Sequence, residues 1–296
     1  MQNTYSITVG KPVSFSKFKE AGFDINALTK DEKAIKLWEH HVEWDISLDD
    51  SDNANQGTLT IYNAPESLVD NLSKSGDMLY TCKIVLNDKL VGVFEITNST
   101  YNDFAEDTKL TLLLSQSLKQ KNKTQFVRTY PRNTTHHTIV TDLIKDMGSN
   151  LGVIPNSLKD YKLVSNTSLM GTPWTILTKL LSPNYKFTVV NNVVDVLGID
   201  ERTSEVKAYK IVNDNLLAPP TKSKDVTPDL KQETLSVTIP YAQLIKPLEV
   251  VVLDLPEHGH QGVYKVLSSS MRFSFDGGTN TQTLLLTKTD KNYKVV

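Results

Sequence analysis

The residues best suited to bind a metal ion lie together near the C-terminal end of the chain. Glu257, His258 and His260 supply one carboxylate and two imidazoles, and both groups are good ligands for zinc and other divalent ions. Pro256 precedes them and Gly262 follows, between two alternating apolar patterns. A polar hairpin loop explains these residue types fully, so we expect no functional metal here.

The remaining nucleophiles and histidines show no catalytic arrangement. Cys82 is the only cysteine and lies in an alternating apolar run, so we expect a small buried side chain and no intrachain disulfide. The paired histidines at 40–41 and 136–137 are sequence neighbours that point apart on a strand or a helix, so neither pair chelates unaided. Gly-x-Ser-x-Gly, Walker A and Gly-x-Gly-x-x-Gly motifs do not occur. The sequence therefore predicts no catalytic residue, no cofactor and no enzymatic activity.

Acidic and aromatic residues raise two further possibilities. Residues 45–52 hold four aspartates, but their spacing does not match a calcium-binding EF-hand loop, and a polar turn accounts for them. Trp38, Trp44 and Trp174 are widely spaced. They could form a platform for a carbohydrate, although three core or interface aromatics explain them as well.

The composition is that of a folded globular protein without a basic field. Of 296 residues, 39% are hydrophobic and 22% are charged, which excludes wholesale disorder. The formal net charge is −2, so we expect no nucleic-acid recognition. No run approaches the ~18 apolar residues that span a bilayer, and residues 1–5 do not begin a secretory signal. We expect that the protein does not insert into a membrane and that it is made and folds first in a cytoplasm.

The N-terminal part of the chain alternates between apolar and polar residues. This period of two begins at 42–48 and continues to about position 118, which indicates strands with one buried face. Residues 15–41 interrupt the pattern, and 31–38 have helical composition. We predict a small antiparallel β-barrel over residues 1–120 with an insertion over 15–41. The expected elements are strands at 42–48, 58–62, 78–86, 90–96 and 110–114, and a short helix at 67–72.

Residues 121–202 change to the period of an α-helix. The apolar residues of 139–147 fall on one helical face, and Gly148 follows where a C-terminal cap is needed. Thr172 and Pro173 suit the cap and first position of a second helix. We therefore predict an α+β middle module, closed by a hairpin with strands at 186–190 and 193–197 around the turn Asn191-Asn192.

The last third of the chain contains a polar stretch and a second β region. Residues 203–233 are polar and hold several prolines, so we predict a linker or long loop. Alternation returns over residues 234–296, which we predict to form a C-terminal β-barrel module. Its expected strands are 235–239, 248–253, 263–267, 271–275 and 281–287.

Several local patterns occur in a defined order along the chain. Residues 57–63 (GTLTIYN) follow a strand and a polar turn, and residues 90–97 (LVGVFEIT) form a later strand. Residues 185–197 follow the paired helices, and 262–266 and 281–284 belong to the closing strands. From about position 42 to 289, this order resembles the phage tail hub proteins related to the late control gene D proteins and to the hub of contractile-tailed phages. The chain departs from the family's "Phe-x-Gly" strand because its glycine precedes the phenylalanine.

The resemblance implies a fold, an assembly and a set of partners. The fold would be α+β and mainly β, with two tail-tube-like antiparallel β-barrel modules and an α+β middle module. The subunit would form a homotrimer whose six barrels match a sixfold tail tube. It would be a structural baseplate hub that binds the tail tube protein, the central spike protein and other baseplate proteins. It would be part of the virion, assembled in the host cytoplasm.

Three alternatives stay open at this point. The first is another component of the tail-tube end, such as a distal tail protein. The second is a carbohydrate-binding β module that uses Trp38 or Trp44, and the third is a metal-dependent enzyme that uses His258 and His260. The chain has no recognisable lysozyme-like segment, so we expect no intrinsic cell-wall cleavage.

Overall fold

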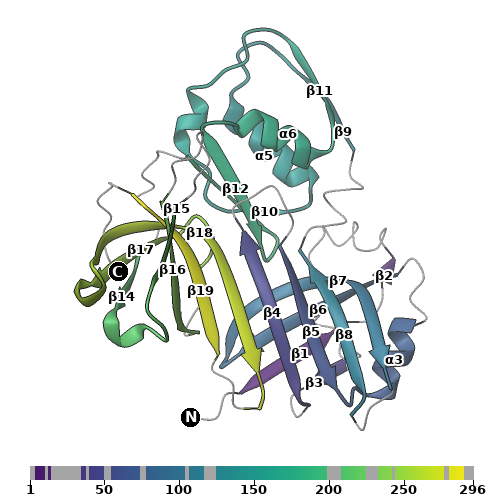
Figure 1. Cartoon of the computed structure of the whole chain (residues 1–296). Coiled ribbons are helices and arrows are strands. Elements are labelled where there is room, and N and C mark those ends of the chain that lie inside the picture. The colour runs from purple at the N-terminus through teal and green to yellow at the C-terminus, as the bar shows by residue number, and fades with distance from the viewer. Residues whose placement is uncertain are drawn as a thin grey trace.

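The computed structural model of the chain contains two β regions and a helical middle module. Figure 1 shows the β regions side by side and the middle module at one end of them. The residues that the structure describes are 4–10, 13–14, 35–37, 40–49, 55–73, 78–103, 107–116, 125–198, 208–224, 233–241, 244–276 and 280–289.

The N-terminal region is an antiparallel sheet in the order β4-β5-β8-β7-β6-β1-β3. Alternating apolar side chains, among them Ile46, Leu59 and Phe94, are fully buried between its layers, and β1 and β6 cross behind β4, β5 and β8 in Figure 1. The elements are β1 (Tyr5–Val9), β2 (Val13–Ser14), β3 (Ile35–Leu37), β4 (Val42–Asp49), β5 (Gln56–Tyr62), α3 (Glu66–Ser73), β6 (Met78–Leu86), β7 (Lys89–Asn102) and β8 (Lys109–Ser115).

One expected helix in this region is wrong over part of its length. Residues 35–37 of the predicted 31–38 helix form β3, which pairs with β1, and Leu37 is fully buried. The edge of β1 supplies backbone partners, and these outweigh a weak local helix propensity. The rest of the 15–41 insertion, apart from residues 40–41, lies outside the described residues.

The middle module is built as the sequence predicts, with two capped helices and a hairpin. Thr135 and Thr172 accept hydrogen bonds from the amides of Thr138 and Thr175, both at 3.2 Å, and so cap the helices. The helices pack on a three-stranded sheet in the order β10-β13-β12, next to the ribbon β11-β9. The elements are β9 (Phe126–Tyr130), α5 (His136–Asp146), β10 (Asn150–Leu151), η1 (Asn156–Lys159), β11 (Thr167–Gly171), α6 (Pro173–Leu181), β12 (Tyr185–Val190) and β13 (Val193–Gly198).

The C-terminal region has the sheet order β15-β16-β19-β18, and β17 pairs with both β18 and β14. Residues 263–267 and 271–275, expected as two strands, belong largely to the single strand β18, which has a bulge between Val266 and Ser268. The elements are β14 (Ala208–Val212), η2 (Asn213–Asn215), β15 (Thr221–Lys224), β16 (Glu233–Pro240), β17 (Val250–Leu255), η3 (Pro256–His258), β18 (His260–Ser274) and β19 (Thr281–Lys288).

The predicted linker at 203–233 contains ordered strands. β14 pairs with β17 in parallel and buries Ala208 and Ile211, while β15 pairs with the edge of β16. The polar composition of this stretch suggested a loop, but neighbouring strands supply the hydrogen bonds that its backbone needs. Residues 199–207 and 225–232 lie outside the described part.

The α+β, mainly β class is confirmed, but the two β regions are not separate barrels. β18 pairs with β4 from Ser268↔Asp49 to Ser274↔Glu43, so both regions belong to one continuous, mainly antiparallel sheet. No ring of paired strands closes among the described strands. The pairing gives β4 and β18, at the edges of the two regions, a backbone partner. Alternation in the sequence predicts strands but not which strands pair. We call this pairing the β4–β18 seam.

The two β regions nevertheless share a strand order. β5-β8-β7-β6 in the first region corresponds to β16-β19-β18-β17 in the second, and β4 and β15 occupy equivalent places beside β5 and β16. The long strands β7 and β18 both carry a bulge, between Ile96 and Asn98 and between Val266 and Ser268. The two regions therefore share a strand order, but the hypothesis of two separate barrel modules is wrong, because one continuous sheet joins them.

Candidate functional site: the polar face of the shared sheet

One face of the shared sheet is polar across both β regions. Side chains that neighbour one another on adjacent strands form rows, and we call the two rows named here the polar face. One row runs from β16 to β8 through Thr238, Thr283, Ser270, Ser47, Gln56 and Ser115. The next runs from β19 to β7 through Thr281, Arg272, Asp45, Thr58, Leu113 and Asn98. Hydroxyls and amides make up the whole first row and half of the second.

The polar face crosses the seam through direct side-chain contacts. Arg272 Nε lies 2.7 Å from Asp45 Oδ2, and the Ser270 hydroxyl donates to Asp45 Oδ1 at 3.4 Å. On the opposite face of the same strands, the rings of Trp44 and Phe273 stack with centroids 3.9 Å apart. The seam therefore joins the two regions through an apolar contact inside and charged and hydroxyl contacts outside.

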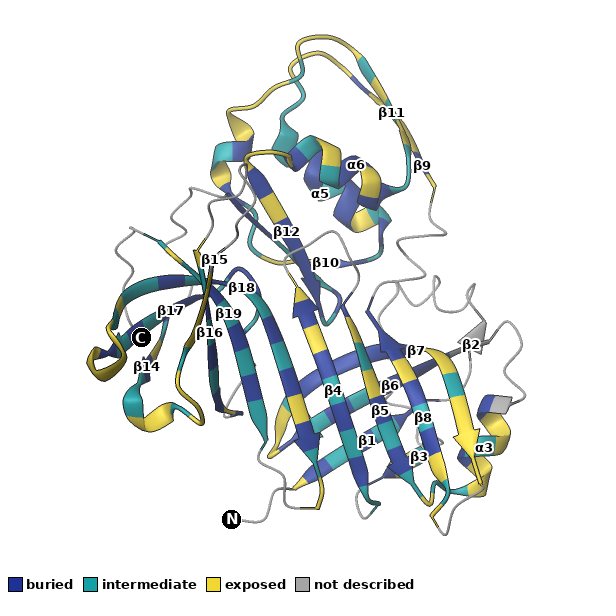
Figure 2. Ribbon diagram, viewed as in Figure 1, coloured by how far each residue is buried: buried dark blue, intermediate teal, exposed yellow. Residues whose placement is uncertain are grey.

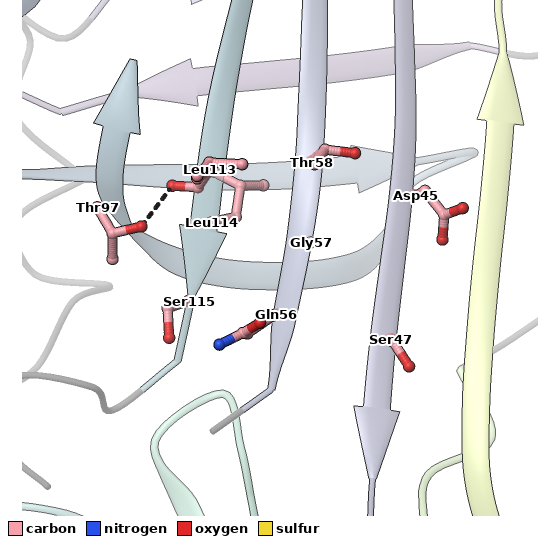
Figure 3. A pocket seen from close by; sticks show the side chains of 9 residues that line it. All are labelled: Asp45, Ser47, Gln56, Gly57, Thr58, Thr97, Leu113, Leu114 and Ser115. Carbon is pink, nitrogen blue, oxygen red and sulfur yellow. Dashed lines mark hydrogen bonds between the residues drawn. The ribbon is translucent and has the colours of Figure 1, made fainter. Parts of the chain in front are cut away.

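One depression of the described surface lies on this polar face (Figure 3). It has a volume of about 410 Å³ and is open to solvent. Thr97 Oγ1 donates to the Leu113 carbonyl at 3.1 Å along one wall. The lining holds neither a nucleophile beside a base nor a pair of carboxylates, so it offers hydrogen-bonding groups but no catalytic arrangement. The lining residues are Asp45, Ser47, Gln56, Gly57, Thr58, Thr97, Leu113, Leu114 and Ser115.

The histidines near the C-terminus lie in a tight turn. His258 ends η3, Gly259 adopts a left-handed φ of 69°, and His260 begins β18. Burial, then the nearby charges of Lys222 and His258, lower the pKa of His260, which favours a neutral imidazole near pH 7. Among the described residues, no three His, Cys, Asp or Glu side chains gather as a metal site would require.

The other candidates have structural surroundings. Cys82 is fully buried, and burial raises its pKa to about 12, so it is no activated thiolate. Trp44 and Trp174 are buried, the latter edge-on to Phe187, so neither forms an exposed platform for a sugar. Trp38, Asp50 and Asp52 lie outside the described residues.

Sequence reasoning missed one charged cluster in the middle module. Asp142 of α5 accepts hydrogen bonds from Arg128 Nη1 at 2.8 Å and from the Tyr130 hydroxyl at 3.0 Å. Burial, followed by the neighbouring Asp142, raises the pKa of Tyr130 to about 12. The cluster ties β9 to α5, and because its members come from separate elements, only the fold brings them together.

Comparison with known structures is informative where comparison with sequences is not. No family model matches the chain, and no curated protein matches it. Across the described residues, no helix is long and apolar enough to cross a membrane. A tail protein from Neisseria meningitidis MC58 is 13% identical, with 96% of each chain covered and a TM-score of 0.64.

The chain has the fold of phage tail proteins. A 43 kDa tail protein of prophage MuSo2 from Shewanella oneidensis is 10% identical over 95% of this chain and 98% of that one, with a TM-score of 0.60. A component of the E. coli type VI secretion system, described as structurally similar to phage T4 tail proteins gp27 and gp5, is 10% identical. It covers 86% of this chain and 76% of that one, with a TM-score of 0.57. At these identities, the tail-protein likeness concerns the fold.

Proposed function

We propose that this protein is a structural baseplate hub of a phage tail, and that it joins the tail tube to the central spike as a homotrimer. The observation that carries the proposal is the repeat of one strand order in two β regions that the β4–β18 seam joins. A seam between two similar modules inside one chain is a model for the contact between modules of neighbouring chains.

The second half of β7 and the strand β15 each have one neighbouring strand among the described residues, as such a contact needs. Beyond its bulge, β18 lies between two strands, β19 and β4. The equivalent part of β7 pairs with β8 on one side, and no described strand pairs with its other side. At the other end, β15 pairs with β16 and has no further strand in the described part. Residues 97–101 (TNSTY) contain neither charge nor proline, the usual protection of an edge strand. Most of this segment is exposed (Figure 2).

The internal seam predicts which residues meet between chains. Ser270 of β18 and Thr100 of β7 hold equivalent positions, because each is the second residue after Ser268 or Asn98, where pairing resumes beyond the bulge. By the same strand equivalence, Ser47 of β4 corresponds to Ser223 of β15. Since Ser270 pairs with Ser47 in the seam, Thr100 of one subunit is expected opposite Ser223 of the next.

Repetition of this head-to-tail contact would close a ring. Three chains would contribute six β modules, in agreement with a sixfold tail tube, and the polar face would line a wet lumen. The expected partners are the tail tube protein above, the central spike protein below and other baseplate proteins around the ring. The protein would act in the virion after assembly in the host cytoplasm, as a structural component and not as an enzyme.

Cysteine cross-linking tests the contact between subunits. A Thr100→Cys, Ser223→Cys double variant, incorporated into tails and treated with a short bismaleimide, should yield covalent species up to the trimer. Each single variant should stay monomeric on a denaturing gel. Ser47→Cys, Ser270→Cys is the matched control, because it should cross-link within one chain. The buried Cys82 does not compete. If the control variant cross-links within the chain but tails of the Thr100→Cys, Ser223→Cys variant give no product between chains, the predicted contact is wrong.

The copy number at the tube end tests the assembly itself. Imaging of an assembled tail should find three copies in a ring between tube and spike. Six copies would favour a distal tail protein or another tube-end component, and one copy would also refute the trimer. Monomers in dilute solution do not bear on the proposal, because the ring is expected to need the tube or the spike for assembly.

A further inference from the structure

The middle module contacts the shared sheet through the tip of its β12–β13 hairpin. Asn55 Nδ2 donates to the Val189 carbonyl at 2.6 Å and to Gln116 Oε1 at 3.1 Å. Gln116 Nε2 donates to Asn191 Oδ1 at 3.0 Å, and Val190 is buried in the apolar cluster of the N-terminal region. The Thr188 hydroxyl also donates to the Asp49 carbonyl at 3.4 Å. We call this contact, made by residues 188–191 with Asp49, Asn55, Gln116 and Val93, the joint.

The joint takes the place of part of a strand ladder. In the C-terminal region, the carbonyl of Val263 accepts from the backbone amide of Thr289, just beyond β19. The equivalent residue of the N-terminal region is Val93, whose carbonyl accepts instead from Gln116 Nε2 at 3.1 Å and whose amide donates to Asn191 Oδ1 at 3.0 Å. Side chains thus satisfy backbone groups that a continued β8 would otherwise pair.

We propose that the joint is a releasable hinge point, at which the middle module separates from the shared sheet while both remain folded. Residues 126–196 of the module have an apolar cluster of their own, formed by α5, α6 and the β12–β13 hairpin. The joint holds neutral amides, the Thr188 hydroxyl and one buried valine. Water can replace the partners of these neutral polar groups without leaving a buried charge. Opening the joint therefore exposes far less apolar surface than unfolding either side.

The amide of Val93 is a direct reporter of this opening. Its hydrogen bond goes to the side chain of Asn191 and not to a neighbouring strand, so its protection from solvent exchange depends on the docked hairpin. In the wild type, the Val93 amide should exchange through an opening that requires less denaturant than the opening of α5 or of β5. The experiment uses the isolated full-length chain, so failure of the proposed ring would not affect it.

The test variant is Asn191→Gly, with Asn192→Gly as its matched control. Both positions have positive φ, 54° and 64°, which glycine adopts without strain. Asn191→Gly removes the acceptor in the joint, whereas Asn192 donates to the Gly148 carbonyl inside the module. Residue-resolved hydrogen–deuterium exchange should show Val93 exchanging about tenfold faster in Asn191→Gly, the effect of losing one hydrogen bond. Amides of α5, α6 and β5 should keep their protection, and Asn192→Gly should leave Val93 unchanged.

A second variant and two outcomes complete the test. Gln116→Leu removes both donors of the Gln116 amide from the joint and should raise the exchange of Val93 in the same way. Unchanged exchange of Val93 in Asn191→Gly would overturn the proposal, because the joint would then not control access to this amide. Simultaneous loss of protection in the joint, α5 and β5 would also overturn it, since the module and the sheet would then open as one cooperative unit.

Discussion

At the scale of single residues, the β4–β18 seam combines two contacts of unequal strength. Trp44 and Phe273 stack face to face and are both buried, so they remove a large apolar area from water. Arg272 and Asp45 pair on the polar face, where 74% and 43% of their side chains are exposed. Solvent screens such an exposed pair, and its net contribution is small.

We expect the two faces of the seam to respond differently to mutation. Trp44→Ala should lower the free energy of unfolding by roughly 3–5 kcal/mol, the usual cost of emptying an aromatic core position. Arg272→Ala should lower it by less than about 1 kcal/mol. Urea unfolding followed by circular dichroism measures both. Equal losses would mean that the ion pair carries more of the seam than its exposure indicates.

Cys82 should be unreactive in the native protein. Burial raises the pKa of this thiol to about 12, so at pH 8 it remains protonated, and the thiolate is the reactive form. Iodoacetamide at pH 8 should therefore modify Cys82 only after the chain unfolds in denaturant, as mass spectrometry would show. Modification of the native protein at the rate of a free cysteine would contradict the buried placement.

The purified protein should contain no stoichiometric metal. Glu257, His258 and His260 occupy a turn, and no group of metal-ligating side chains forms among the described residues. Elemental analysis is the direct measurement. Stoichiometric zinc that disappears in a His258→Ala, His260→Ala double variant would show that this turn binds metal after all.

At the scale of elements, local sequence signals determine the helices of the middle module, and strand pairing determines the residues that the sheet requires. The helices of the middle module begin at threonine caps, and Pro173 occupies the first turn of α6. In β5, a neighbouring strand sets the requirement: a Cβ on Gly57 would lie 2.9 Å from the Asp45 carbonyl oxygen of β4. The first kind of feature can be recognised in a short stretch of sequence, and the second requires knowledge of the neighbouring strand.

Removal of one cap should weaken the middle module. Thr172→Ala deletes the acceptor of the Thr175 amide and should lower the stability of the module by about 0.5–2 kcal/mol. Thr178→Ala is the control, because its hydroxyl donates to the Trp174 carbonyl within α6 and alanine is the better helix former. Thermal unfolding distinguishes them. A loss in Thr178→Ala as large as that in Thr172→Ala would show that the effect does not come from capping.

At the scale of the whole molecule, the apolar clusters do not follow the chain order alone. The N-terminal cluster includes Met271 and Phe273 of β18 together with Val190 of β12. The middle module has its own cluster within residues 126–196. The N-terminal region therefore depends on residues distant in sequence, while the middle module contains its core within one continuous segment.

This difference predicts how fragments behave. A fragment of residues 121–202 should fold cooperatively alone, because its helices, hairpin and core are all present. A fragment of residues 1–120 lacks β18, which leaves the edge of β4 unpaired and Trp44 without Phe273, so it should aggregate or unfold without a cooperative transition. Circular dichroism during heating separates the two outcomes. A stable, cooperative 1–120 fragment would contradict the dependence on the seam.

The sequence by itself determined the elements whose signals are local. The observed elements include the helix predicted over 139–147, the cap Thr172 with Pro173 in the first turn, the turn Asn191-Asn192 and the alternation at 42–48. Each follows from side-chain periodicity or from the conformational preference of one or two residues. The mainly β, α+β class follows from their sum.

Tertiary structure alone decided which elements pair. Residues 35–37 form a strand because they pair with the edge of β1. Residues 208–212, expected to be part of a linker, form a strand because they pair with β17. The two expected barrels share one sheet because β18 pairs with β4. The polar face arises from this long-range pairing, and the joint arises from side chains that distant segments bring together. Contacts between segments distant in sequence carry no local sequence signal.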